Sequence, residues 1–172
     1  MTSPMTPAGV VELLDRYQLP RHLLVALAEV LVTGDREVTL EAGAVLCTQS
    51  DPPDALYLLL DGTLEVRRRD HRNEARVVAL AKAPSLLGHM ALLNDKPRTA
   101  TLSAGDQGAR VVALPAKAVN KLNRSDTPAG SALRRLILAA MLDQHHRVVV
   151  DLLRRAGETE LPLPGGWATV EN

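Results

Sequence analysis

The sequence predicts a mainly β domain: an antiparallel, jelly-roll-like β-roll, with short helices before it and one long helix after it. Between residues 35 and 115, short stretches rich in Val and Leu alternate with clusters of turn-forming residues. Apolar residues recur at helical spacing on either side of this region. A parallel sheet with crossover helices is therefore not expected.

The residue pattern of the N-terminal region predicts a flexible leader followed by two short helices. Residues 1–7 hold two prolines, two threonines and a serine without apolar periodicity, so we expect them to form the leader. From Ala8, two groups of apolar residues follow at helical spacing. Leu19-Pro20 lies between the groups and should separate the two helices.

Seven stretches are predicted to form the strands of the roll. They are Glu37–Leu40, Val45–Thr48, Leu56–Leu60, Thr63–Arg67, Arg76–Leu80, Thr99–Leu102 and Val111–Leu114. Turn-forming residues separate them, including Asp61-Gly62 and the segment Gly105 to Gly108, and each such cluster is expected to reverse the chain.

The residue pattern of the C-terminal part predicts helices and then a tail. Helical spacing returns near Ala116, and Thr127-Pro128 indicates the start of a long helix over about residues 129–156, with Gly157 as a suitable stop. Residues 157–172 contain two prolines and a Gly-Gly pair without periodicity, so we expect a flexible tail. One domain is therefore expected over residues 8–156.

Composition narrows the class of protein. Lys plus Arg and Asp plus Glu total 20 each, so the formal net charge is zero, and the chain has no Phe, one Trp and two Tyr. Proteins that bind nucleic acid usually carry basic charge or aromatic stacking platforms, so direct DNA binding is not expected. No apolar run is long enough to cross a membrane, and the lone Cys47 forms no internal disulfide. We expect a cytoplasmic protein without membrane contact.

Motifs for catalysis or metal binding are missing from the sequence. Adjacent His145-His146 point about 100° apart on a helix, which is unsuitable for one metal ion. The chain has no P-loop, no nucleophile elbow and no paired-histidine zinc motif. We therefore expect no catalytic residue, no metal and no cofactor, and a protein that is not an enzyme.

The strongest candidate for a binding site is residues 86–101, LLGHMALLNDKPRTAT. Gly88 precedes one short turn of helix formers, whose unpaired backbone N–H groups suit an anion such as a phosphate. Arg98 follows Pro97 at the mouth of the next strand, where its guanidinium can bind the same anion. The pattern therefore predicts an anion site formed by this turn and Arg98.

This segment, together with Leu40-Glu41-Ala42-Gly43 and the stretch Asp54 to Gly62, resembles the cyclic nucleotide-binding domain family. That family includes catabolite-activator-type regulators and the regulatory parts of cyclic-nucleotide-dependent kinases, and the similarity covers about residues 35–156. The resemblance implies that Arg98 and the backbone N–H groups of Met90 and Ala91 hold a cyclic phosphate. It also implies a β-roll whose final helix pairs subunits.

The resemblance implies a complete set of site residues. The nucleotide-binding set is Gly88, His89, Met90, Ala91, Arg98, Thr99 and Ala100, and the loosely aligned candidates for a cap over the base are Gln144 and His145. The implied ligand is cAMP or cGMP, and Thr99 does not choose between them.

The main departure from the family pattern is His89, which replaces the glutamate that binds the ribose. A neutral imidazole can accept one hydrogen bond but supplies no countercharge to Arg98. Ser50 also stands where a turn glycine is usual. Three alternatives stay open for this site: weakened nucleotide binding, another small anionic ligand, or an empty pocket.

The long helix carries a possible dimer interface. Leu138, Met141, His145, Val148 and Leu152 alternate at spacings of three and four, as in a coiled-coil seam. We expect a homodimer through this helix, although the same helix also has apolar residues that can pack on the roll.

Two functions fit the sequence. The leading hypothesis is a stand-alone regulatory module that senses a small anionic ligand and signals to an effector protein, whose identity the sequence does not reveal. The alternative is a ligand-free relative of the same fold that acts as a dimerisation or protein-interaction scaffold. His89 favours the scaffold, whereas the intact run from Pro97 to Thr101 favours the sensor.

Overall fold

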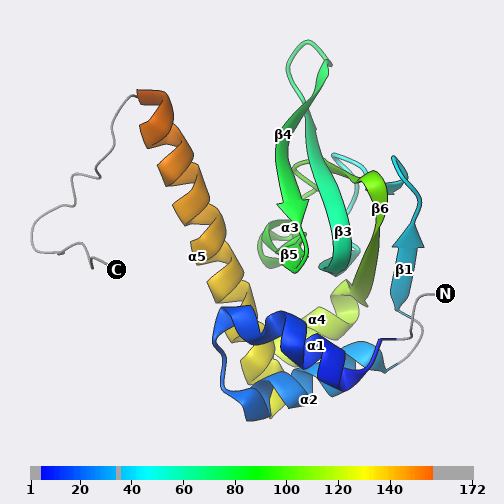
Figure 1. The fold of residues 1–172 in the computed structure, drawn as a ribbon, viewed down its shortest axis with the longest axis vertical. Coiled ribbons are helices and arrows are strands. Elements are labelled where there is room, and N and C mark those ends of the chain that lie inside the picture. The colour runs from blue at the N-terminus through cyan, green and yellow to red at the C-terminus, as the bar shows by residue number, and fades with distance from the viewer. Residues whose placement is uncertain (1–4, 34–35, 157–172) are drawn as a thin grey trace, which may run out of the picture.

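The computed structural model describes residues 5–33 and 36–156 of the chain. A β-roll lies at its centre, with helices at one end and a long helix along one side (Figure 1). The expected mainly antiparallel roll with flanking helices is confirmed.

The first helices are α1 (Pro7–Leu14), the 3-10 turn η1 (Asp15–Tyr17) and α2 (Arg21–Val32). Helix α1 begins inside the expected leader, because Thr6 Oγ1 accepts a hydrogen bond from the Gly9 N–H at 3.2 Å and Pro7 occupies the first turn. Gln18 adopts a left-handed conformation, and Pro20 precedes α2, so the chain breaks between the two helices as expected.

Six strands pair in one antiparallel sheet. They are β1 (Glu37–Leu40), β2 (Val45–Cys47), β3 (Ala55–Arg69), β4 (Ala75–Lys82), β5 (Ser85–Leu87) and β6 (Thr101–Pro115). The main path runs β1-β6-β3-β4, while β2 also pairs with β6 and β5 also pairs with β3. Strand β4 therefore has β3 as its one described neighbour and forms an edge of the sheet.

Strands β3 and β6 each join two stretches that the sequence suggested were separate. Asp61-Gly62 makes no turn, because β3 continues through it with register shifts on either side, and Gly62 has a φ of 77°. Likewise, β6 runs through Gly105 to Gly108. Glycine within a strand can form a bulge as well as a turn, and the length of the flanking apolar runs did not distinguish the two. The strand β5, which overlaps the start of the candidate binding segment 86–101, was not predicted.

After the roll come α4 (Ala116–Asn123) and α5 (Pro128–Ala156). Thr127 starts α5 as expected, since its Oγ1 accepts a hydrogen bond from the Gly130 N–H at 3.2 Å. The expected tail, with Gly157 as its first residue, lies outside the described residues. Among the described helices, none is long and apolar enough to cross a membrane.

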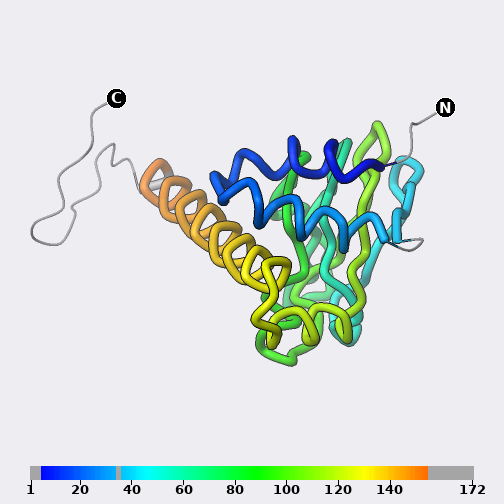
Figure 2. Tube along the Cα trace, turned by 90° about the horizontal axis from the view of Figure 1, so that it is seen from below, coloured from blue at the N-terminus to red at the C-terminus, as the bar shows by residue number. Residues whose placement is uncertain are grey.

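The main core lies between the helices and one face of the roll. The buried residues of α1, α2, β3, β6 and the first half of α5 form one apolar cluster, which includes Leu14, Leu24, Leu114 and Leu133. Figure 2 shows α1 and α2 side by side across the roll, while α5 runs out beyond them. The first half of α5 is thereby fixed to the roll, and its second half carries far less buried surface.

Candidate functional site

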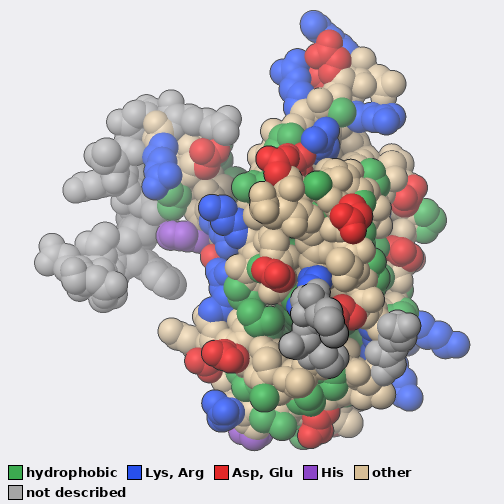
Figure 3. Space-filling model, turned by 45° about the vertical axis from the view of Figure 1, so that its right-hand side comes forward, with side chains coloured by type: hydrophobic (Ala, Val, Ile, Leu, Met, Phe, Trp, Pro, Cys, Tyr) green, Lys and Arg blue, Asp and Glu red, His purple; other side chains and the backbone are tan. Residues whose placement is uncertain are grey.

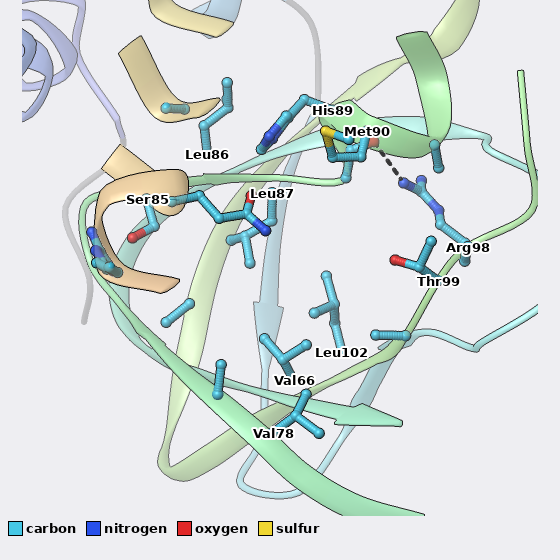
Figure 4. A pocket seen from close by; sticks show the side chains of 18 of the residues that line it. Val66, Val78, Ser85, Leu86, Leu87, His89, Met90, Arg98, Thr99 and Leu102 are labelled. Carbon is cyan, nitrogen blue, oxygen red and sulfur yellow. Dashed lines mark hydrogen bonds between the residues drawn. The ribbon is translucent and has the colours of Figure 1, made fainter. Parts of the chain in front are cut away.

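A cavity of about 470 Å³ opens between the roll and α5. Strands β3 to β6 and the short helix α3 (His89–Asn94) form its inner wall, and α5 contributes Ala140, Asp143, Gln144, Arg147 and Val148. Its volume lies within the range of sites that hold small molecules. We call residues 86–101 the cassette. Figure 4 shows its residues His89 and Met90 above the cavity and Arg98 and Thr99 to the right, with Val66 of β3 and Val78 of β4 below.

Gly88 is required at the turn into α3. Its φ is 80°, a left-handed conformation that favours glycine. A Cβ atom at this position would lie 2.5 Å from Arg98 Nη1 and 3.2 Å from the Ala55 carbonyl oxygen. The glycine therefore allows the backbone of the cassette to approach the arginine closely.

The backbone of Arg98 is fixed by the turn before β3. The Arg98 N–H donates to the Asp51 carbonyl at 2.8 Å, and the Ser50 N–H donates to the Arg98 carbonyl at 2.8 Å. Ser50 itself adopts a φ of 77° in that turn. This two-bond anchor connects the cassette to a loop nearly fifty residues earlier in the chain.

The guanidinium of Arg98 is buried, with 4% of the residue exposed. It donates to Asp54 Oδ1 at 2.6 Å, to the Ala55 carbonyl at 2.5 Å and to the Gly88 carbonyl at 3.2 Å. It also lies over the ring of Tyr57, with 5.0 Å between Cζ and the ring centroid. These contacts hold the side chain in one position in the wall of the cavity.

One donor of Arg98 has no partner. Its Nε is buried and makes no hydrogen bond, although a buried N–H normally finds an acceptor. The three hydrogen bonds of the side chain are made by Nη1 and Nη2 and use three of the five guanidinium N–H groups. Since Arg98 lines the cavity, the remaining donors suit an anionic ligand.

Asp54 supplies the negative charge beside Arg98. Partial burial acts to raise the pKa of this carboxyl group, but the hydrogen bond and the charge of Arg98 outweigh burial and lower it. Tyr57 donates its hydroxyl to Asp54 Oδ1 at 3.2 Å, and burial raises the pKa of Tyr57 to about 12. Asp54 is thus a carboxylate partner for Arg98 in a chain that has His89 in place of the family glutamate.

His89 lines the cavity, but its imidazole points away from the arginine. The histidine is 4% exposed, and neither of its ring nitrogens has a hydrogen-bond partner. In Figure 4 its imidazole points toward Leu86, on the side of the cavity opposite to Arg98. Burial lowers the pKa of His89, and the backbone of Leu86 counters this in part. A neutral imidazole in this position supplies no countercharge.

The structure brings the sequence-derived site residues together. Seven of them line the cavity, namely Gly88, His89, Met90, Ala91, Arg98, Thr99 and Ala100. Gln144 also lines it, whereas His145 does not and is exposed on α5. Of the two residues considered as a cap over the base, the cavity therefore includes only Gln144.

Several lining residues were missed by sequence reasoning. Arg68 near the β3–β4 hairpin and Asp143, Arg147 and Val148 on α5 all line the cavity. Arg68 belongs to a run of arginines that is typical of an exposed hairpin, and the α5 residues lack a local motif. Only the packing of α5 against the roll brings the three α5 residues to the site. Among the described residues, no group of three or more His, Cys, Asp or Glu is placed to hold a metal ion.

The family model of the cyclic nucleotide-binding domain matches residues 37–126, which is more than half of the chain. The chain therefore belongs to the cyclic nucleotide-binding domain family, and the sequence-based resemblance is confirmed. The matched region runs from β1 to the end of α4 and includes the whole cassette.

Two curated relatives carry the same description, cAMP-dependent protein kinase regulatory subunit. The one from Yarrowia lipolytica is 41% identical over 64 residues, covering 37% of this chain and 16% of the relative. The one from Dictyostelium discoideum is 31% identical over 101 residues, covering 54% and 29%. This chain thus spans less than a third of the length of either relative.

Solved structures show the same fold at low identity. A cyclic nucleotide-binding domain from Methylobacillus flagellatus superposes with a TM-score of 0.69 at 19% identity, covering 90% of this chain and 86% of that one. The catabolite activator protein of Thermus thermophilus gives a TM-score of 0.57 at 24% identity, covering 75% and 59%. The likeness includes α5 and the N-terminal helices, beyond the region that the family model matches.

Proposed function

We propose that this chain is a regulatory module that binds a cyclic nucleotide in the cavity at Arg98. The observation that carries the proposal is the buried guanidinium of Arg98, which lines the cavity and keeps an unpartnered Nε–H. The left-handed Gly88 beside it places the N–H groups of Met90 and Ala91 in the first turn of α3, where they have no partner within the helix. Together these donors match a singly charged cyclic phosphate.

The proposed ligand is cAMP or cGMP, with cAMP favoured by the names of the curated relatives. In the proposed role the chain has no catalytic residue: ligand binding changes the contacts of α5, and an effector protein reads that change. The support for α5 as the responding element is that Gln144, Arg147 and Val148 line the cavity, while the outer half of the helix is held by few buried residues.

The test is calorimetric titration of the purified chain with cAMP, cGMP and cyclic dinucleotides. The proposal expects saturable binding of at least one cyclic mononucleotide. Binding of a cyclic dinucleotide alone would assign the cavity to another anionic ligand, and a chain that binds none of these compounds would contradict the proposal.

His89 favours a second candidate function, a ligand-free scaffold, because a ribose has no carboxylate acceptor at this position. Titration of the His89→Glu variant distinguishes the two functions. If the wild type binds no cyclic nucleotide and this variant does, the scaffold function is favoured, since one substitution then restores a site that is otherwise complete.

We also propose that the chain forms a homodimer through the outer face of α5. Leu138, Leu142 and Leu152 are 57%, 62% and 60% exposed. At 100° per residue they share one face of the helix, opposite to the buried Leu136 and Ala140. Two members of the seam suggested by the sequence lie elsewhere, since Met141 packs against the main core and Val148 lines the cavity. Leu142 takes their place on the outer face.

A further inference from the structure

The imidazole of His89 is a buried polar group that makes no hydrogen bond. The residue is 4% exposed, and neither Nδ1 nor Nε2 has a partner among the described residues. Buried polar atoms of side chains normally have a partner in the protein or in ordered water. Because His89 also lines the cavity, a molecule bound in the cavity is placed to supply that partner.

The surroundings of this imidazole are uncharged. Burial is the main cause that lowers the pKa of His89, and the backbone of Leu86 counters it, without a contribution from a charged side chain of the described residues. The charged side chains that Figure 3 shows gathered at the tip of the β3–β4 hairpin are thus not neighbours of the ring. A neutral imidazole has one N–H donor and one nitrogen lone pair. The part of a ligand that meets His89 should therefore be uncharged and offer an acceptor or a donor.

His89 and Arg98 lie on opposite sides of the cavity. Figure 4 shows the imidazole pointing toward Leu86, whereas Arg98 lies beside Thr99 on the other side. In a 3′,5′-cyclic nucleotide, the phosphate is fused to one side of the ribose and the base projects from the other side. With the phosphate at Arg98, the base therefore extends toward the side of the cavity that His89 lines.

We propose that His89 binds the base of the nucleotide and not the ribose. The inference rests on the proposed function and assigns a new role to this position, where the family glutamate binds the ribose. Adenine displays its amino group, a donor, next to the acceptor N7 on one edge. Either tautomer of a neutral imidazole therefore finds a complementary group on that edge.

The test is calorimetric titration of cAMP and three analogues into the wild type and into His89→Leu. Each analogue lacks one group of cAMP: 2′-deoxy-cAMP lacks the free ribose hydroxyl, 7-deaza-cAMP lacks the nitrogen N7, and purine riboside 3′,5′-cyclic phosphate lacks the amino group. Leucine is apolar and suits a buried position, and circular dichroism checks that the variant is folded.

The loss of one hydrogen bond between neutral groups predicts that His89→Leu binds cAMP about two- to ten-fold more weakly than the wild type. At least one of the two base analogues should bind the wild type more weakly by a similar factor. His89→Leu should bind that analogue as well as it binds cAMP, because the same contact cannot be lost twice. Any effect of removing the ribose hydroxyl should be equal in both proteins. His22→Leu changes an exposed histidine on α2, does not alter the cavity, and should bind as the wild type does.

Equal affinity of the wild type and His89→Leu for cAMP would overturn the proposal. A penalty for 2′-deoxy-cAMP that disappears in His89→Leu would assign His89 to the ribose, and would also overturn it. The same holds if His89→Leu weakens the binding of all four nucleotides by one common factor, since that result indicates a change in packing alone. If neither protein binds any of the four nucleotides, the proposed function itself fails, and this inference fails with it.

Discussion

At the scale of single residues, the arginine of the cassette is organised by groups far away in the sequence. Asp54, the Ala55 carbonyl and Tyr57 hold the guanidinium, while Gly88 leaves room for it. The cassette motif predicted that Arg98 meets an anion, and the intramolecular carboxylate that already neutralises part of its charge is a finding of the structure. In the proposed function, a phosphate would therefore join a hydrogen-bond network that Asp54 and two backbone carbonyls already satisfy in part.

His89 should make the fold sensitive to acid. Burial lowers its pKa, so the unfolded chain takes up a proton at about pH 6.5 while the folded chain stays neutral. The contribution of His89 to the free energy of unfolding is fully present above that pH. It is lost as the pH falls below that value, by at most about 1.4 kcal/mol per pH unit. Urea unfolding between pH 5 and pH 8 measures this dependence.

The variant His89→Leu should flatten that dependence, and His22→Leu, which changes an exposed histidine on α2, is its control. Asp54 does not obscure the result. Folding lowers the pKa of Asp54, so the contribution of Asp54 to the free energy of unfolding is lost only as the pH falls from about 3.8 toward the lower pKa of the folded chain. The buried position of His89 is contradicted if His89→Leu retains the full loss of stability between pH 6.5 and pH 5.

Ser50 should be a site of backbone strain. Its φ of 77° is left-handed, which costs a non-glycine residue roughly 1–2 kcal/mol, and its side chain is exposed. We expect Ser50→Gly to raise the free energy of unfolding by about 1 kcal/mol and Tm by about 2–4 °C. Thermal unfolding followed by circular dichroism checks this. Ser50→Ala keeps the Cβ atom and should bring no gain, so equal stabilisation by both variants would rule out relief of strain.

At the scale of elements, the two halves of α5 have different surroundings. Its first half packs against α2 and the roll through Leu133, Leu136 and Ile137. Its second half presents one side to the cavity and the other side to solvent. The spacing of apolar residues alone did not separate these faces, because apolar residues occur all around the helix.

The outer face of α5 should control self-association. The double substitution Leu138→Glu/Leu142→Glu should convert the proposed dimer into a folded monomer, because buried carboxylates without partners are costly at an interface. Light scattering over a range of concentrations measures the mass. Val25→Glu/Val45→Glu alters two exposed valines on other elements and is the control. A wild type that is monomeric at every concentration, or a double variant that stays dimeric, would remove this face from any interface.

At the scale of the whole molecule, the sequence predicted the architecture better than the inner details of the site. The roll, the opening helices and the long helix follow from local patterns of apolar and turn-forming residues. The cassette was found because its residues are contiguous. By contrast, Asp54, Arg68 and Arg147 reach the site from other elements, and no local pattern relates them to Arg98. The orientation of His89 also depends on the packing around Leu86 and could not be derived from its position in the motif.

The central claim is that the cavity of this cyclic nucleotide-binding domain holds its ligand through Arg98. The most direct measurement is titration of cAMP into the wild type, Arg98→Ala and Arg110→Ala by calorimetry, with folding of each variant checked by circular dichroism. Arg110 is the matched control, because it is an arginine on β6 that is paired with Glu37 at 2.8 Å and does not line the cavity.

A charge-assisted hydrogen bond contributes about 1.5–3 kcal/mol, so the account predicts that Arg98→Ala weakens cAMP binding by about ten-fold or more. Arg110→Ala should bind as the wild type does. Arg98→Lys should lie between the wild type and Arg98→Ala, since it keeps the positive charge without the guanidinium geometry. Equal affinity of the wild type and a folded Arg98→Ala variant would contradict the account.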